Sequence, residues 1–299
     1  MRISPYGSLI VALVTPFGPG LEVDYPKARA LAARLVSEGC DGVVVSGTTG
    51  ESPTLTAEEK TRLVAEIKEE LRDRARVWAG TSGYNTTESV ELTRRAEAAG
   101  ADGILAVTPY YNKPSQEGLY RHFRAVSEET GLPVMLYNVP GRTSVNMLPD
   151  TVLRLAELRN VVAVKEASGS VDQSSHILAS CPDDFYVFSG DDSLTLPILS
   201  VGGSGIVSVA AHLVARRLRD MLDFYREGEL TKARDVHLRL YGLFKVLFVT
   251  TNPVPVKTAL ELCGNPCGGF RLPLCPPDER EKAQIARVLV DLGLSEKSG

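Results

Sequence analysis

Short apolar runs rich in valine and isoleucine alternate along this chain with longer amphipathic stretches. The runs end, in order, at Val14, Val45, Ala79, Val107, Tyr137, Lys165, Ser189 and Ser208. Successive ends are 19 to 34 residues apart, which leaves room for a helix before each following run. Most runs are continuously apolar, as parallel strands covered on both faces are. The pattern predicts eight repeated βα units, although the last spacing is short.

Eight such units favour an α/β fold of the (β/α)8 TIM-barrel type, with a doubly wound parallel sheet as the alternative. After about Glu227 the pattern changes to three helices without strands between them: Glu229 to Val249, Pro255 to Leu262 and Asp278 to Leu292. We therefore expect a barrel at residues 1–227 and a C-terminal helical region at 228–299. Since no flexible linker separates them, this three-helix appendix should pack directly against the barrel.

Capping residues mark two of the expected helix starts. Residues 24–37 carry apolar side chains at helical spacing, and Asp24 stands at the N-cap position. Thr56 and Glu59 have the form of a capping box, in which each side chain accepts a hydrogen bond from a free N–H at the helix start.

Composition removes several classes of protein. The 299 residues are 43% hydrophobic and 23% charged, which excludes collagen-like and disordered chains. With 33 basic and 37 acidic residues the net charge is −4, so no basic field is available to bind a nucleic-acid backbone. The longest apolar run near the start, residues 9–14, is too short for a membrane span or a secretory signal. We expect a cytoplasmic protein that binds neither membranes nor nucleic acids.

The reactive groups of familiar metal and phosphate sites are missing from the pattern. Five cysteines, an odd number, do not suggest a disulfide scaffold. Cys263, Cys267 and Cys275 lie close together but form no CxxC pair, and no histidine is near enough to complete a zinc finger. Asp191 and Asp192 lack a third ligand nearby, and no GxxxxGK[ST], HExxH or GxSxG motif is present. We expect no metal site and reduced cysteines.

Lys165 is the most informative residue, because active sites of TIM barrels lie at the C-terminal ends of the strands. It closes the run 161–164, and period-two alternation puts it on the same face as Ala163 and Val161. If that face is the barrel interior, desolvation favours the uncharged amine, which attacks carbonyl compounds. On the motif alone, the more common alternative is a strand-end lysine that reaches solvent.

Other strand ends carry groups that suit carbonyl chemistry. Tyr137 and Thr49 could relay protons near a lysine, although a tyrosine at such a position more often packs at the rim of a core. Arg142 follows in a Pro-Gly turn and could bind a carboxylate through paired N–H donors, or form a surface salt bridge. Gly47 and Gly50 flank two threonines and could expose N–H groups to a small anion.

Seven segments taken together resemble the dihydrodipicolinate synthase family, part of the pyruvate class I aldolase superfamily that includes N-acetylneuraminate lyase. The similar segments span most of the chain and are LVTPF (13–17), GTTGES (47–52), TPYYNKPSQEGLY (108–120), LYNVPGRT (136–143), KEASG (165–169), SGDD (189–192) and NPVPVKTAL (252–260). The resemblance implies condensation of pyruvate with aspartate semialdehyde, in lysine and diaminopimelate biosynthesis, through a Schiff base on Lys165.

The resemblance also implies roles for single residues. Thr49, Tyr137 and Tyr111 correspond to a proton relay, and Tyr111 would come from an adjacent subunit. The remaining matched positions bind substrate: Thr48 and Thr49 hold the pyruvate carboxylate, Arg142 binds the carboxylate of the semialdehyde, and the carbonyls of Gly190 and Val207 line the pocket. No cofactor is implied, and a homotetramer built as a dimer of dimers is the expected assembly.

Two alternatives remain: another pyruvate-dependent class I aldolase or lyase that acts on a keto-deoxy sugar acid or other aldehyde, and a non-catalytic protein that senses a keto acid. Lyases of keto-deoxy sugar acids share the Lys and Tyr strand ends but lack the turn that carries Arg142, and a non-catalytic keto-acid sensor would not need Lys165. In feedback-inhibited relatives, histidines and an asparagine bind lysine at a subunit interface. This chain has Ala57, Lys60 and Tyr84 at those places, although Glu88 and Tyr110 match the regulated relatives. We therefore expect weak or absent inhibition by lysine.

Overall fold

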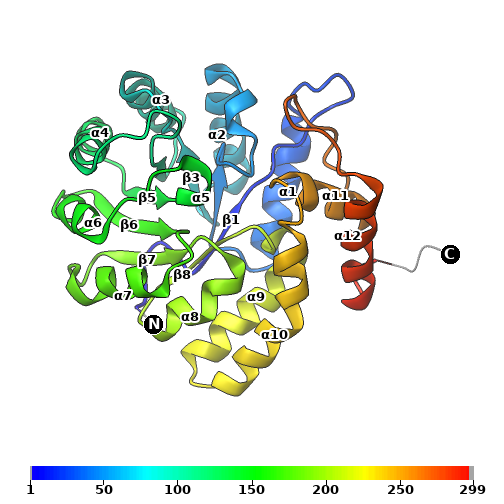
Figure 1. Ribbon diagram of the computed structural model, residues 1–299. Coiled ribbons are helices and arrows are strands. Elements are labelled where there is room, and N and C mark those ends of the chain that lie inside the picture. The colour runs from blue at the N-terminus through cyan, green and yellow to red at the C-terminus, as the bar shows by residue number, and fades with distance from the viewer. Residues whose placement is uncertain (1, 296–299) are drawn as a thin grey trace.

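Eight parallel strands close into a barrel in the computed structural model, which describes residues 2–295 (Figure 1). Each strand pairs with its neighbours in chain order, and β8 pairs with β1. The strands are β1 (Leu9–Ala12), β2 (Gly42–Val45), β3 (Arg76–Gly80), β4 (Gly103–Val107), β5 (Val134–Asn138), β6 (Val161–Glu166), β7 (Tyr186–Ser189) and β8 (Gly205–Ser208). The predicted TIM barrel is confirmed, and the doubly wound sheet is wrong.

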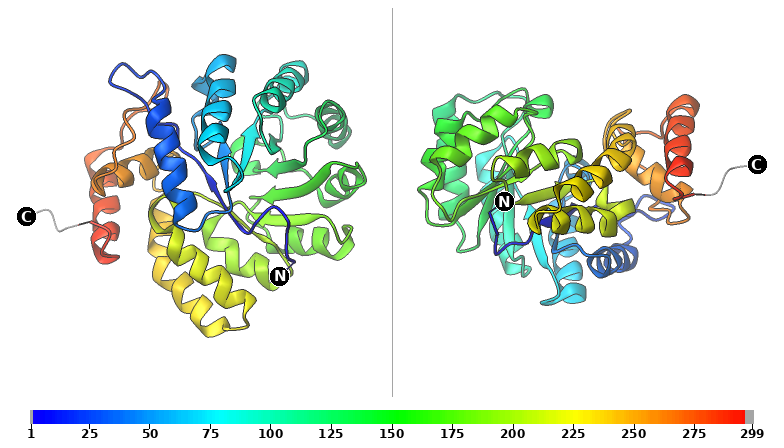
Figure 2. Two further views of the ribbon diagram at one scale, coloured as in Figure 1. Left: turned by 180° about the vertical axis from the view of Figure 1, so that it is seen from behind. Right: turned by 90° about the horizontal axis from the view of Figure 1, so that it is seen from below.

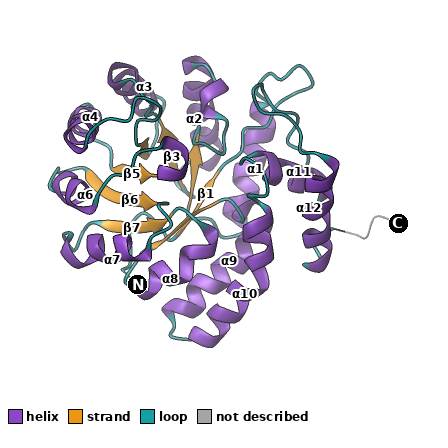
Figure 3. Ribbon diagram, viewed as in Figure 1, coloured by secondary structure: helices purple, strands orange, loops and turns teal. Residues whose placement is uncertain are grey.

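Helices surround the barrel, as the view by secondary structure in Figure 3 shows. The helices of the barrel region are α1 (Tyr25–Ser37), α2 (Ala57–Leu71), α3 (Thr86–Ala98), α4 (Gln116–Glu128), α5 (Pro140–Thr143), α6 (Pro149–Ala156), α7 (Val171–Ser180), α8 (Thr195–Ser200) and α9 (Ala211–Arg226), with 3-10 turns η1 (Ser52–Thr54) and η2 (Asp192–Leu194). Asp24 caps α1 by accepting the Lys27 N–H, and Thr56 and Glu59 form the predicted capping box of α2.

The strand ends lie within one residue of their predicted positions except in β1. That strand ends at Ala12, two residues before Val14. The apolar run continues because Leu13 and Val14 are buried, and the Val14 N–H donates to Nε2 of His212 at 3.1 Å. Burial alone therefore extends a hydrophobic run beyond the residues that form the strand ladder.

The barrel wall separates two clusters of buried apolar side chains. The larger one fills the space between strands and helices, and the smaller one fills the barrel interior. Ala163 lies in the interior cluster, as predicted, but Val161 lies in the outer one. The ladder between β5 and β6 shifts register by one residue here, pairing Val134 with Val161 and Met135 with Ala163. The expectation that Val161 shares the face of Lys165 is therefore wrong, because this irregularity breaks the alternation.

The C-terminal region consists of α10 (Leu230–Val246), α11 (Val254–Leu262) and α12 (Glu279–Asp291), close to the three expected helices. The chain turns from α9 into α10 at residues 227–229, where the sequence pattern changes. α10 packs on α9, and α11 packs on α9 and α12. In the views of Figure 2, α12 lies at the outer edge of the molecule. Within residues 2–295, no helix combines the length and hydrophobicity needed to span a bilayer.

Candidate active site

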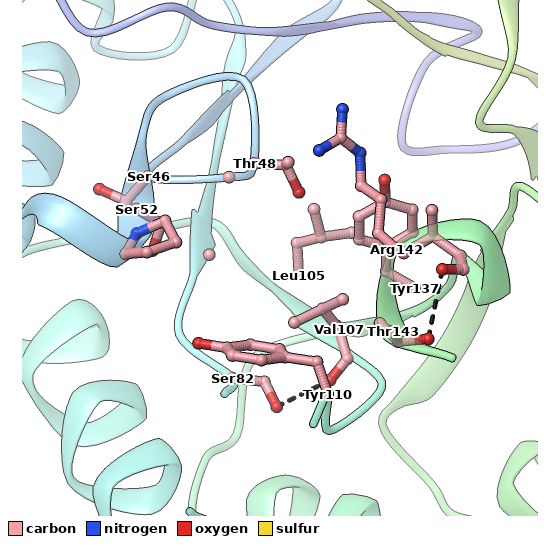
Figure 4. Close-up of a pocket in the computed structure, with 14 residues that line it drawn as sticks. Ser46, Thr48, Ser52, Ser82, Leu105, Val107, Tyr110, Tyr137, Arg142 and Thr143 are labelled. Atoms are coloured by element: carbon pink, nitrogen blue, oxygen red, sulfur yellow. Dashed lines mark hydrogen bonds between the residues drawn. The ribbon is translucent and has the colours of Figure 1, made fainter. Parts of the chain in front are cut away.

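A cavity of about 200 Å³ lies where the carboxyl ends of β2 to β5 meet, the end of the barrel at which TIM-barrel active sites are found (Figure 4). Three of the predicted site residues line it: Thr48, Tyr137 and Arg142. The cavity wall is largely apolar, with Leu105 and Val107 of β4 and with Pro53 and Val139, and a few polar side chains lie among them. This combination of an apolar wall and a few directed polar groups suits a small polar metabolite.

Lys165 lies inside the barrel beside this cavity. It pairs with Tyr137 across β5 and β6, and its Nζ lies 4.1 Å from the centre of the Tyr137 ring. The residue is 5% exposed, so the alternative of a solvent-facing lysine is wrong. No carboxylate within residues 2–295 forms an ion pair with it; its neighbour is the electron-rich face of an aromatic ring. Tyr137 is thus shared between the amine and the cavity.

Gly190 provides the space for the lysine side chain. A Cβ atom at this position would lie 3.1 Å from Cε of Lys165 and 2.7 Å from Cβ of Ala167. The Gly190 N–H donates to the Glu166 carbonyl at 2.7 Å, which fixes this close approach of β7 to β6. Val207 is fully buried in the interior cluster on β8. The structure therefore brings Gly190 next to Lys165, while neither Gly190 nor Val207 lines the cavity of Figure 4.

The two threonines after β2 differ in where their side chains lie. Thr48 lines the cavity, and Figure 4 shows it on the same cavity as Tyr137 and Arg142. Thr49 is 3% exposed, and its hydroxyl accepts a hydrogen bond from Nδ2 of Asn252 at 2.9 Å. The family resemblance implies a relay hydroxyl on Thr49. The geometry instead directs Thr48 into the cavity, because Thr49 is turned toward the C-terminal region.

Arg142 lies at the mouth of the cavity. It belongs to α5, a single turn that begins at Pro140 directly after β5. The side chain is exposed, and Nη2 donates to the Asn252 carbonyl at 3.4 Å. A guanidinium held on one side and open on the other can bind a carboxylate that enters the cavity.

Tyr111 does not reach the cavity of its own chain. It is 91% exposed and has a φ of 70°, a conformation that costs energy for an aromatic residue. Its neighbour Tyr110 lines the cavity instead and packs edge-on against Tyr84, with ring centres 5.3 Å apart. Burial raises the pKa of the Tyr110 hydroxyl above its ordinary value.

Asn252 is a site residue that the sequence did not predict. Its side chain donates to Thr49, its carbonyl accepts from Arg142, and its Oδ1 is buried without a hydrogen-bond partner among the described residues. Asn252 precedes α11, more than 100 residues after Arg142 in sequence. The similarity of segment 252–260 to a family motif is the one signal in the sequence for its place at the site.

A second missed group lies behind the strand ends. Glu166 is buried, and its carboxylate accepts hydrogen bonds from Nδ2 of Asn138 at 3.2 Å, from the Ser168 N–H at 2.7 Å and from Nε2 of Gln173 at 2.9 Å. Asn138 and Glu166 directly follow Tyr137 and Lys165 and pair across the same strands. They therefore hold the outer side of the ladder whose inner side carries the lysine and the tyrosine.

The side chains of Asp191 and Asp192 accept hydrogen bonds from backbone N–H groups. Asp192 is buried and accepts from the Ser208 hydroxyl at 2.5 Å and from the N–H groups of Val209 and Ala210, both at 3.1 Å. Burial raises the pKa of Asp192 to about 6, although these hydrogen bonds lower it. Asp191 caps the turn η2. Within residues 2–295, no group of three His, Cys, Asp or Glu side chains could hold a metal ion.

Comparison with known proteins agrees with this architecture. The model of the dihydrodipicolinate synthetase family matches residues 5–292. The 4-hydroxy-tetrahydrodipicolinate synthase of Heliobacterium modesticaldum is 54% identical, over 97% of this chain and 96% of that protein. The chain belongs to the dihydrodipicolinate synthetase family.

Solved structures show the same similarity. Dihydrodipicolinate synthase DapA-2 from Bacillus anthracis superposes with a TM-score of 0.94 at 45% identity, covering 96% of this chain and 99% of that one. The enzyme from Cyanidioschyzon merolae with lysine bound superposes with a TM-score of 0.95 at 44% identity, covering 97% and 99%. The barrel with its C-terminal helices is therefore the fold of the family.

Proposed function

We propose that this chain is a 4-hydroxy-tetrahydrodipicolinate synthase, which condenses pyruvate with L-aspartate 4-semialdehyde. The observation that carries the proposal is the buried Lys165, held against the ring of Tyr137 beside a cavity that Arg142 borders at its mouth. Similarity to synthases over nearly the full length supports these two substrates rather than a keto-deoxy sugar acid.

Lys165 is the nucleophile of the proposed reaction. Its amine attacks the C2 carbonyl of pyruvate, and loss of water gives an imine. Loss of a methyl proton converts the imine to an enamine, whose carbon attacks the aldehyde of the second substrate. The amino group of that substrate then attacks the imine carbon, which closes the ring and releases Lys165. The imine accepts the electrons, so the reaction needs no metal or organic cofactor.

Proton transfers during these steps need hydroxyls close to the amine. Tyr137 is in contact with Lys165, and Thr48 shares the cavity with Tyr137. We assign the relay to Tyr137 and Thr48, because the hydroxyl of Thr49 is already held by Asn252. Thr49 contributes to the site through its backbone.

The substrate carboxylates need two binding places. Among the described residues, the N–H groups of Thr48 and Thr49 make no hydrogen bond within the chain, which leaves them free to hold the carboxylate of pyruvate. We assign the carbonyls of Gly190 and Val207 to the inner end of the pyruvate pocket, behind the cavity of Figure 4, because Gly190 contacts the Lys165 side chain and Val207 faces the barrel interior. Arg142, at the mouth, binds the carboxylate of the semialdehyde.

The relay is completed by a neighbouring subunit. The exposure and backbone strain of Tyr111 support its insertion into the active site of a second copy of the chain. A dimer is then the smallest active unit, and a homotetramer built as a dimer of dimers is the proposed assembly. The five cysteines form no disulfide, which supports a cytoplasmic enzyme.

Trapping of the imine tests the mechanism. Borohydride in the presence of pyruvate should add one reduced pyruvate to the peptide that contains Lys165, as measured by mass spectrometry. Lys257, a lysine of similar burial, is the matched control and should remain unmodified. An unmodified Lys165 peptide would exclude the Schiff-base mechanism. Turnover of aspartate semialdehyde compared with cleavage of keto-deoxy sugar acids then tests the choice of substrate.

A further inference from the structure

The loop between β2 and α2 carries Thr48. Its backbone is strained at two non-glycine residues. Ser46 and Glu51 both adopt left-handed conformations, with φ of 57° and 56°. Non-glycine residues hold such conformations only where the surrounding structure imposes them. The position of Thr48 in the cavity therefore depends on what holds this loop.

The C-terminal region supplies that hold through a buried ion pair. Nζ of Lys257, in α11, lies 2.9 Å from Oε1 of Glu51, and the two side chains are 1% and 0% exposed. Lys257 also donates to the carbonyls of Thr15 and Gly269, at 3.3 and 2.5 Å. The second oxygen of Glu51 accepts the Arg271 N–H at 3.2 Å. Within residues 2–295, every donor to the Glu51 carboxylate thus comes from residues 257–271.

Further contacts join the same two segments. The Arg271 guanidinium donates to the Thr54 carbonyl at 2.9 Å and forms an ion pair with Glu59 at the start of α2. Asn252 binds Thr49 on the other side of the loop. The loop is therefore held at Thr49, Glu51 and Thr54 by residues 252–271 of the C-terminal region.

Stability alone does not explain a buried pair at this place. Desolvation of two charges offsets most of their attraction, so an apolar pair of similar volume generally stabilises a protein equally well. An ion pair with well-aligned hydrogen bonds does, however, define one geometry. In this chain the geometry that it defines is that of the turn next to Thr48 and Thr49.

We propose that Glu51 and Lys257 are positioning residues for the active site, which set the loop so that Thr48 and the N–H groups of Thr48 and Thr49 face the substrate. The inference rests on the proposed function of this cavity. It makes the C-terminal helical region a part of the catalytic unit, although no charged side chain of residues 228–295 lines the cavity.

The double variant E51Q/K257M separates positioning from stability. It removes both charges while keeping the volume of each side chain, so no unpaired charge is buried. Only the carbonyls of Thr15 and Gly269 lose a donor, and the melting temperature should therefore fall moderately while the protein stays folded. Because the loop loses its defined geometry, the KM for pyruvate should rise and kcat should fall, lowering kcat/KM by about 10- to 100-fold. Wild-type kinetics in the folded double variant would overturn the proposal.

A matched control pair lies at the opposite end of the barrel. Nη2 of Arg219 and Oδ2 of Asp41 are 2.6 Å apart, far from the cavity in the fold, next to the N-terminal end of β1. The variant D41N/R219M should change kcat/KM by less than about twofold. A fall equal to that of E51Q/K257M would also overturn the proposal, since it would show that any such pair affects the rate.

A milder variant covers the case in which E51Q/K257M fails to fold. Glu51→Asp keeps both charges but shortens the carboxylate by one methylene, so it shifts the loop without leaving a charge unpaired. It should raise the KM for pyruvate, and an unchanged KM and kcat would contradict the proposal. Imine trapping in the unmodified protein is the separate test of the proposed function: its failure there rejects the function, whereas a defect only in the variants supports the positioning role.

Discussion

The two faces of β5 and β6 differ in how far their buried polar side chains are provided with hydrogen-bond or ion-pair partners. On the outer face, the Glu166 carboxylate accepts hydrogen bonds from Asn138, Ser168 and Gln173. On the inner face, the adjacent Lys165 lies against an aromatic ring, without an ion pair among the described residues. A polar group without its partners is costly to bury, whereas a fully bonded one is not. The difference indicates that the outer face provides structure and the inner face keeps an amine free to react.

Among the variants that test this difference between the two faces, removal of the Lys165 amine should have the largest effect on activity. Lys165→Met should lower kcat by at least about 10³-fold, because the covalent route is lost. The variant should keep or increase its melting temperature, since an amine without a charged partner has been removed from the interior. Steady-state kinetics and thermal unfolding measure the two effects. A large loss of stability would show that Lys165 is also structural.

The pH dependence of stability tests a second fully bonded group, His212. Its Nδ1 lies 2.9 Å from the Val209 carbonyl and its Nε2 accepts the Val14 N–H, so the ring is held neutral. Burial lowers its pKa from 6.5 to about 4. The unfolded chain therefore binds more protons between those values, and the contribution of this group is lost as pH falls from 6.5 to 4. The loss is on the order of 3 kcal/mol.

The variant His212→Gln isolates this contribution from those of other buried groups. His122 has a pKa lowered in the same direction, to about 4, whereas Asp192 has one raised to about 6 and acts with the opposite sign. The free energy of unfolding, measured with urea at several pH values, should fall less steeply between pH 6.5 and 4 in the variant than in the unmodified protein. Equal slopes would mean that His212 titrates normally.

Glu166→Ala should mainly reduce stability. It leaves the donors of Asn138, Ser168 and Gln173 buried without their acceptor, which costs about 2 to 3 kcal/mol in the free energy of unfolding. The matched variant Glu166→Gln keeps one acceptor oxygen and should lose less. Urea unfolding measures both. If Glu166→Ala retained its stability and instead lost activity as Lys165→Met does, the assignment of structure to the outer face would be wrong.

Tyr111→Phe removes one hydroxyl from a surface position and tests the relay across subunits. The variant should lower kcat by about 10- to 100-fold with little change in melting temperature, because the side chain is 91% exposed in one chain. Tyr84→Phe, also an exposed tyrosine, is the control and should keep the rate. Unchanged activity of Tyr111→Phe would exclude the proposed relay between subunits.

Inhibition by lysine is the smallest expected effect. Ala57 and Tyr84 offer no carboxylate, and Lys60 is a cation whose pKa is lowered by burial. These residues suit a cationic amino acid poorly. Lysine should leave the rate nearly unchanged at concentrations that strongly inhibit a regulated relative assayed in parallel, and comparable inhibition would contradict this prediction.

The strand pattern was predictable because parallel strands buried on both faces form continuous hydrophobic runs. The same logic located Lys165 and Tyr137, since residues at the strand ends face the active site of a barrel. It failed at Val161, where a one-residue shift in the ladder reverses the faces. Such an irregularity leaves no mark in the hydrophobic pattern.

The choice between Thr48 and Thr49 was not predictable from sequence. Adjacent residues of identical type carry the same local signal, and their orientation depends on the left-handed turn at Ser46 and on Asn252, about 200 residues later. The buried pair of Glu51 and Lys257 has the same origin. Contacts between segments this distant are set by the closed fold, and no local pattern reports them.

The separation of Glu51 and Lys257 by 206 residues also has a consequence for biosynthesis. A ribosome translates the loop of Thr48 early and adds residues 252–271 only after all eight strands have been made. Lys165 and all eight strands are therefore present in the nascent chain before the segment that fixes the loop has been made. The loop can reach its final geometry only after this last part of the chain has been added.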